Sequence, residues 1–156
     1  MSDTPIKRYL DDLAVGMRFK SSTLTVTAAD IIAFGKQFDP QPFHIDVVAA
    51  KTSVFGGLAA SGWHTAALTM KLFVESELQF AGGAVGAGIE VLEWPHPVRP
   101  GDTLHLDIEV LLVRESKTKP TQGIVMVRTT TLNQHNQVVQ ILQPKMVARK
   151  RPAEVS

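Results

Sequence analysis

An acid and a histidine stand five residues apart in the segment FDPQPFHID. A carboxylate and an imidazole are the equipment of general acid–base catalysis, because one group can take a proton from a water molecule that the other orients. Pro40 and Pro42 fix φ and push the residues before them out of the helical region, so we expect them to end a helix and to hold Asp39 and His44 on a stiff, extended loop. The spacing alone favours a plainer role, in which Asp39 caps a turn, His44 caps the next helix and Gln41 bonds to the backbone.

The second segment with chemical potential is GGLAASGWHT. Its small residues let another backbone or a ligand come close, and a helix is expected to begin near Gly62 and Trp63. Backbone N–H groups at the N-terminus of a helix have no partner within it, so they can stabilise a developing negative charge such as an oxyanion. Close packing of the chain, with Ser61 as an ordinary N-cap, explains the same residues equally well.

The remaining polar residues carry weaker signals. His64 falls within the expected buried helix, where a hydrogen-bonded core histidine is the favoured interpretation. His96 lies between prolines in a loop, and Arg99, which is able to meet a phosphate, is interpreted as a solvated loop residue. His44 and His64 do not have the spacing of metal ligands and no Asp or Glu completes a set, so we expect no metal site.

The first half of the chain has the patterns of helices. Thr27, followed by Asp30, is the expected N-cap of a helix of about three turns. A shorter helix is expected to begin near Asp46. The segment GWHTAALTMKLFVESEL has apolar side chains nearly all round a helix, which predicts burial on most sides and a solvated end at Lys71, Glu75 and Glu77.

The second half changes to the period of a strand. TLHLDIEVLLV alternates apolar and polar residues, the pattern of a half-buried antiparallel strand. GIVMVRTTTL and QVVQIL are two further strands joined by the polar turn NQHN, PKMVARK extends the last one beyond Pro144, and GAVGAGIEVLEW precedes them as a glycine-rich strand. Helices followed by antiparallel strands predict an α+β fold, with one long buried helix against a curved sheet.

Length and composition set the class of protein. The 156 residues suit one domain, expected over residues 1–150, with a disordered tail at 151–156. A formal net charge of +1 without a basic stripe argues against nucleic acid as a partner. The chain has no cysteine, which excludes a disulfide, a thiolate zinc site and a cysteine nucleophile. The polar first residues, and the lack of an apolar run of roughly 18 residues, lead us to expect a cytoplasmic protein without a membrane partner.

The segment FDPQPFHID resembles the hydratase-2 motif of the MaoC-like dehydratases and (R)-specific enoyl-CoA hydratases, which runs Asp-x-Asn-Pro-hydrophobic-His-x-Asp. FGGLAASGWHTAA resembles the family segment F-x-x-x-I-x-H-G-M that opens the central helix. WPHPVRPGDTL resembles the family's proline-hydrophobic-x-x-Gly-Asp stretch before a strand. The resemblance covers residues 10–150.

The resemblance implies a hot-dog fold, in which an antiparallel sheet wraps a long central helix. It implies a hydratase or dehydratase of fatty acid metabolism that adds water to an enoyl-CoA-type thioester, or removes it from a 3-hydroxyacyl thioester. CoA or an acyl-carrier protein presents the substrate, and no metal or redox cofactor is required. Family members act at least as dimers, with the thioester in a tunnel near the subunit interface, so a homodimer or a dimer-based higher oligomer is implied.

The resemblance also assigns roles to positions of this chain. Asp39 and His44 match the catalytic acid and histidine, and Gly62 matches the glycine whose N–H binds the thioester oxygen. We expect Asp39 and His44 to share one water molecule close to the Gly62 amide, inside an apolar channel. The other residues expected at the substrate are the neighbours of these three: Ser61, Gln41 and Trp63.

Three positions depart from the family pattern. The family Asn is Gln41 here, the His before the glycine is Ser61, and a serine on the central helix falls at Met70. These residues support the acid–histidine pair, so we expect a changed substrate choice or rate. Two alternatives stay open: a non-catalytic acyl-thioester-binding subunit, and a hot-dog thioesterase. The second is disfavoured because that class places its acid on the central helix, whereas Glu75 and Glu77 lie toward its solvated end.

Overall fold

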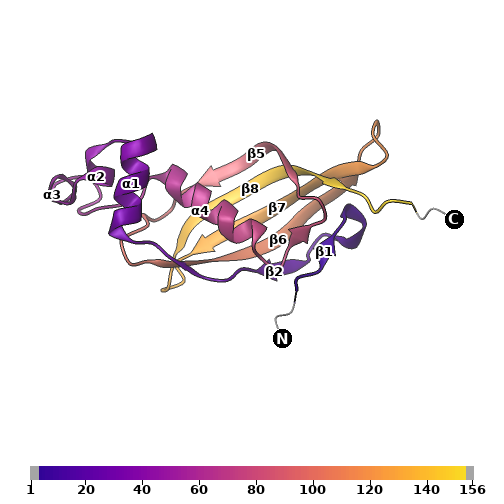
Figure 1. Cartoon of the computed structure of the whole chain (residues 1–156), viewed down its shortest axis with the longest axis horizontal. Helices are drawn as coiled ribbons and strands as arrows, with labels where there is room; N and C mark the ends of the chain where they lie inside the picture. Colours follow the sequence, from indigo (N-terminus) through magenta and orange to yellow (C-terminus); the bar gives the residue numbers. More distant parts are fainter. Residues whose placement is uncertain (1–3, 154–156) are drawn as a thin grey trace.

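Alternating apolar residues in the second half of the chain build an antiparallel sheet. Strands β6 (Thr103–Glu115), β7 (Gln122–Leu132) and β8 (Val138–Arg149) pair in succession, and β5 (Val85–Glu93) pairs with the other side of β8. Two short strands, β2 (Arg18–Lys20) and β3 (Leu24–Thr25), pair with β6. The structure, a computed structural model that describes residues 4–153, therefore has the strand order β2-β6-β7-β8-β5 (Figure 1).

One long helix crosses this sheet, and the others gather beyond its end. The long helix is α4 (Gly62–Val74), which lies along one face of the sheet (Figure 1). The shorter helices α1 (Ala28–Phe38), α2 (Pro42–Ile45) and α3 (Val47–Ala50) lie at the N-terminal end of α4. A 3-10 turn, η1 (Leu10–Asp12), and a small parallel pair, β1 (Lys7–Arg8) with β4 (Gln79–Phe80), complete the elements.

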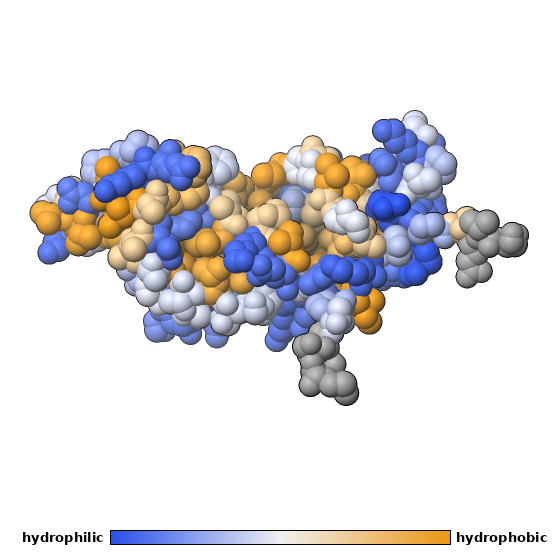
Figure 2. Space-filling view, viewed as in Figure 1, coloured by the Kyte–Doolittle hydropathy of each residue, from blue (hydrophilic) through white to orange (hydrophobic). Residues whose placement is uncertain are grey.

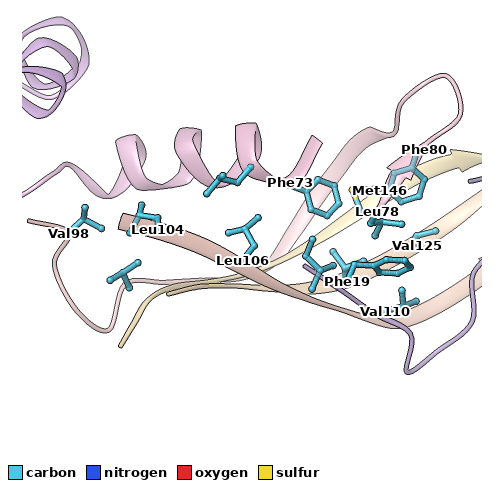
Figure 3. Packing of buried hydrophobic residues seen from close by; sticks show 14 of the residues in the cluster. Phe19, Phe73, Leu78, Phe80, Val98, Leu104, Leu106, Val110, Val125 and Met146 are labelled. Atoms are coloured by element: carbon cyan, nitrogen blue, oxygen red, sulfur yellow. The ribbon is translucent and has the colours of Figure 1, made fainter. Parts of the chain in front are cut away.

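The core lies between α4 and the sheet. The predicted alternation of β6 is confirmed, because the four apolar residues of that alternation, Leu104, Leu106, Ile108 and Val110, are all buried. Figure 3 shows Leu104 and Leu106 below α4, and Phe73 at the end of that helix close to Met146. The prediction that α4 is buried on most sides is wrong for one face. Trp63, Met70 and Val74 are exposed there, because no element of residues 4–153 covers them.

The helix ends follow the expected caps, with one difference at the prolines. Thr27 accepts a hydrogen bond from the Asp30 N–H, and the Asp30 carboxylate accepts one from the Thr27 N–H, so the predicted capping pair of α1 is confirmed. Asp46 caps α3 alone, because its carboxylate accepts from the N–H groups of Val48 at 2.9 Å and Ala49 at 3.1 Å. The expected extended loop is instead the helical turn α2, because the fixed φ of Pro42 already suits the first position of a helix.

The end of the chain differs from the prediction of a disordered tail at 151–156. Arg151 is held, since its guanidinium donates to the Asp12 carboxylate at 2.7 Å and its backbone N–H donates to Asp11 at 2.6 Å. The same guanidinium lies 4.9 Å from the centre of the Tyr9 ring. The rest of that prediction, at 154–156, lies outside the described residues. Within residues 4–153, none of the helices has the length and apolar composition needed to cross a bilayer.

Candidate active site

Asp39 and His44 meet although they belong to different elements. Asp39 is the C-cap of α1, His44 lies in α2, and Asp39 Oδ2 is 3.3 Å from His44 Nε2. Gly35 in α1 allows the two helices to approach this closely. A Cβ at that position would lie 2.8 Å from the His44 carbonyl oxygen and 2.9 Å from the side chain of Ile45. The short distance between acid and histidine therefore depends on a glycine in the preceding helix.

The backbone fixes the ring of His44. The side chain is buried, and its Nδ1 lies 2.6 Å from the carbonyl oxygen of Ala59. Because a carbonyl oxygen only accepts, Nδ1 carries the hydrogen, and Nε2 of the neutral ring is an acceptor that faces Asp39. Two acceptors 3.3 Å apart are bridged by a group with two hydrogens, and a water molecule is the smallest such group. Asp39 Oδ2 and His44 Nε2 are therefore close enough for one water molecule to contact both.

The carboxylate of Asp39 is held by two side chains. Gln41 Nε2 donates to Oδ1 at 2.7 Å, and Ser61 Oγ donates to Oδ2 at 2.7 Å. Burial raises the pKa of Asp39, but the two hydrogen bonds and the nearby His44 outweigh it and hold the pKa below its ordinary value of 3.8. Asp39 is therefore ionised at neutral pH. The expectation that the Gln41 side chain bonds to the backbone is wrong, since it contacts the carboxylate.

Ser61 and Gly62 connect the start of α4 to this acid. Ser61 is buried and serves as the N-cap of α4, accepting from the Trp63 N–H at 3.3 Å while it donates to Asp39. Gly62 is the first residue of the helix, and no acceptor within residues 4–153 takes its N–H. A free amide at a helix N-terminus thus lies one residue from the serine that contacts the carboxylate.

The ring of Trp94, which the sequence patterns did not single out, packs against Gly62. A Cβ at position 62 would lie 2.6 Å from the Trp94 ring, so only glycine fits. The indole N–H donates to Gln140 at 2.9 Å, and the Trp63 ring meets the Trp94 ring edge-on at 5.6 Å between centroids. Gln140 is fully buried. In the sequence, the only signal for the contact between Trp94 and Gln140 is that Gln140 interrupts the apolar residues of a strand.

The other candidate residues make no hydrogen bond or ion pair with Asp39 within residues 4–153. His64 is buried and stacked on Phe34 at 4.7 Å, but its Nδ1 has no hydrogen-bond partner in the described residues, so the expected hydrogen-bonded histidine is wrong. That ring packs against an aromatic side chain, which offers no acceptor. His96 is exposed. Glu75 and Glu77 lie beyond the C-terminal end of α4, far along the helix from Gly62.

The predicted apolar channel around this site is not among the best-formed hollows of the described residues 4–153. The most apolar of these hollows, of about 260 Å³, lies near the C-terminal end of α4. Met70, Phe73, Phe80 and Met146 are among the residues that line it. Of the acid and the histidine, only Asp39 is partly accessible, with 19% of its side chain exposed, whereas His44 is buried.

The model of the MaoC like domain family matches residues 12–133. The chain belongs to this family. It is 36% identical over 127 residues to the uncharacterized protein YdeM of Bacillus subtilis, a match over 80% of this chain and 87% of that protein. Its sequence is 54% identical to that of a MaoC-like dehydratase from Rhodospirillum rubrum. The crystal structure of that protein superimposes with a TM-score of 0.90 over 94% of this chain and 99% of that one.

A more distant structure shares the fold of the MaoC-like chain. The R-hydratase PhaJ1 from Pseudomonas aeruginosa superimposes with a TM-score of 0.70 at 23% identity, over 95% of this chain and 93% of that one. The predicted hot-dog fold of the α+β class is confirmed by these two likenesses. Membership of the family supports a lyase-type enzyme, a hydratase or a dehydratase.

Proposed function

We propose that this MaoC-like chain adds water to an enoyl-CoA-type thioester, or removes it from the matching 3-hydroxyacyl thioester. The observation that carries the proposal is the contact of an ionised Asp39 with His44 Nε2 at 3.3 Å, tied through Ser61 to the free amide of Gly62. The three groups supply a base, a water-orienting ring and an oxyanion donor.

The reaction follows from the positions of these groups. Asp39 accepts a proton from a water molecule that contacts both it and His44, and the water oxygen forms a bond to C3 of the enoyl group. The electron pair of the double bond moves to C2 and on to the thioester oxygen, where the Gly62 N–H stabilises the enolate. C2 then takes the proton back from the Asp39–His44 pair, which returns Asp39 to the carboxylate. Dehydration is the same path in reverse.

The proposed chemistry needs neither a metal nor a redox cofactor, because the leaving or attacking group is water and the charge develops on one oxygen. CoA or an acyl-carrier protein would present the acyl group. Such thioesters occur in fatty acid metabolism, so we expect a cytoplasmic enzyme of that metabolism.

A second copy of the chain is the partner that the surface favours. β5 is an edge strand of nine residues whose outer side pairs with no strand of residues 4–153, and its Ile89 is 57% exposed. Beside it, Trp63 of α4 is 60% exposed and Val74 57%. Figure 2 shows apolar side chains over α4 and at the edge where β5 lies. An open edge next to an apolar helix face is normally covered, so we expect a homodimer that closes the channel over Gly62.

Turnover is tested by the ultraviolet absorbance of the conjugated thioester, followed over a panel of short, long, branched and dicarboxylic enoyl-CoAs. Asp39→Asn is expected to lower kcat by about 10²- to 10⁴-fold, the usual contribution of a general base. Ligand binding should survive, because the amide keeps the shape of the site. Asp46→Asn is the matched control, since Asp46 only caps α3 and should leave turnover unchanged.

Three results would contradict the proposal. Hydration by Asp39→Asn at the wild-type rate would show that Asp39 is not the base. Thioester binding without turnover by the wild-type chain on every substrate would favour the non-catalytic binding subunit. Release of free thiol in place of hydration would favour the thioesterase.

The homodimer is tested by light scattering coupled to size-exclusion chromatography. Ile89→Lys places a charge on the open edge and should shift the chain to monomer, whereas Val15→Lys changes an exposed apolar residue in the turn beside β6 and should not. A wild-type chain that is monomeric at micromolar concentration would rule out this interface.

A further inference from the structure

Arg99 makes contacts that the proposed chemistry leaves unused. It was expected as a solvated loop residue able to meet a phosphate. In the structure its guanidinium turns back onto the backbone of residues 55–58, where Nη1 donates to the carbonyl oxygens of Gly57 at 3.0 Å and Leu58 at 3.4 Å. Nη2 donates to the carbonyl oxygen of Phe55. Both terminal nitrogens are therefore engaged by carbonyl oxygens.

The turn that carries Arg99 is itself fixed. The buried Asp102 carboxylate accepts from the Arg99 N–H at 2.8 Å, and the Asp102 N–H donates back to the Arg99 carbonyl oxygen at 3.0 Å. Gln134 donates to the second carboxylate oxygen at 3.0 Å. Next to Arg99, the Val98 carbonyl accepts from the Ala60 N–H at 2.9 Å. The guanidinium is thus presented from a rigid support beside the segment that it binds.

The segment held by Arg99 leads directly into the site. Residues 55–61 belong to no helix or strand, so their carbonyl groups depend on partners from elsewhere. The carbonyl that follows those bound by Arg99 belongs to Ala59, and it fixes Nδ1 of His44 at 2.6 Å. Ser61 and Gly62 come next, with the contact to Asp39 and the free amide. The contacts of Arg99 therefore hold the backbone just before the Ala59 carbonyl, which fixes the His44 tautomer, and before the Gly62 amide.

We propose that Arg99 is a positioning residue for the site. By binding the backbone carbonyl groups of Phe55, Gly57 and Leu58, it sets the direction of the Ala59 carbonyl. It thereby keeps His44 in the Nδ1–H tautomer, with Nε2 toward Asp39. The kinetic part of this proposal rests on the proposed hydratase function, whereas the effect on His44 does not. A lysine cannot replace the guanidinium, because its single nitrogen cannot reach three carbonyl groups in a planar fork.

The first test is spectroscopic and needs no substrate. Nitrogen-15 NMR of the histidine rings, with the His44 signal assigned by its loss in His44→Gln, reports which nitrogen carries the hydrogen. Wild type should show the Nδ1–H tautomer, and Arg99→Lys should show a mixture of tautomers. The control Arg128→Met removes an exposed arginine that pairs with Glu109 on the sheet and should leave the His44 signal unchanged.

The second test is kinetic. Arg99→Lys and Arg99→Ala are expected to lower kcat by about 10²-fold with little change in KM, because misplacement of the reacting groups affects the transition state more than binding. Methylguanidine should restore part of the activity of Arg99→Ala and none of that of Asp39→Asn. If Arg99→Ala does not fold, Arg99→Lys and the NMR signal decide.

An unchanged His44 tautomer in Arg99→Lys, or wild-type kcat in that variant, would overturn the proposal. Failure of the hydratase function is a separate result, because the wild-type chain would then show no turnover while the tautomer measurement still reports on Arg99.

Discussion

Replacing Ser61 by alanine tests the link between the start of α4 and the proposed base. The hydroxyl makes two hydrogen bonds: it accepts from the Trp63 N–H at 3.3 Å as the N-cap, and it donates to Asp39 Oδ2 at 2.7 Å. Loss of an N-cap costs about 1 kcal/mol, and loss of a hydrogen bond to a charged group costs about 1.5 to 3 kcal/mol. Ser61→Ala should therefore lower the free energy of unfolding by about 2.5 to 4 kcal/mol at neutral pH, which a domain of ordinary stability survives.

The same change should move the titration of Asp39. The Ser61 hydrogen bond is one of the contacts that hold the pKa of Asp39 below its ordinary value, so its removal raises that pKa. The acidic limb of the kcat/KM profile, which reports the base of the free enzyme, should shift to higher pH. The assay is the hydration rate measured from about pH 3 to neutral pH.

Stability should show the same linkage. A carboxyl group with a depressed pKa stabilises the fold fully above its unfolded pKa of about 3.9, and this contribution is lost as pH falls through the folded pKa. Ser61→Ala removes part of it, so the stability difference from wild type should be largest near neutral pH. At about pH 3 the difference should be smaller, because it moves toward the N-cap part as Asp39 takes up its proton. Urea denaturation at the two pH values measures both quantities.

Ser76→Ala is the matched control. Ser76 is also buried, and it caps the other end of α4, donating to the Phe73 carbonyl at 2.7 Å and accepting from the Leu78 N–H at 3.1 Å. Its loss should cost about 1 to 3 kcal/mol at every pH, because both partners are neutral. The reasoning is refuted if Ser61→Ala leaves the acidic limb in place and loses the same stability at both pH values.

Three further changes test the site and its surroundings. Gly62→Ala would place a Cβ 2.6 Å from the Trp94 ring, so the oxyanion amide must move, and kcat should fall by about 10²- to 10³-fold in the hydration assay. Gln41→Ala removes the other side-chain hydrogen bond to Asp39 and should raise its pKa, shifting the acidic limb in the direction of Ser61→Ala at little cost in stability, because Gln41 is exposed. Burial holds the pKa of His64 below 6.5, so the wild-type fold loses stability as pH falls from neutral through the folded pKa of His64. His64→Phe should abolish that part of the loss. Urea denaturation at about pH 8 and 5.5 measures the difference.

The sequence by itself determined the elements whose patterns are local. The alternation of β6 and the capping pair at Thr27 and Asp30 depend on neighbours a few residues away, and the structure has both as predicted. The α+β order of helices and strands follows from the same local periodicities. The Asp39 and His44 pair could be singled out because five residues with two prolines leave their backbone few conformations.

The tertiary structure decided what those residues contact. Three sets of contacts at the site join positions up to 44 residues apart, and no local pattern encodes them. Gln41 and Ser61 both donate to Asp39. Trp94 packs against Gly62, and Arg99 binds the backbone of residues 55–58. The helical turn at Pro42 was misjudged because proline permits both an extended segment and a helix start, and only packing of α2 against α1 at Gly35 selects between them. Residue types thus indicated the chemistry, whereas distances fixed by long-range packing decide which atoms can perform it.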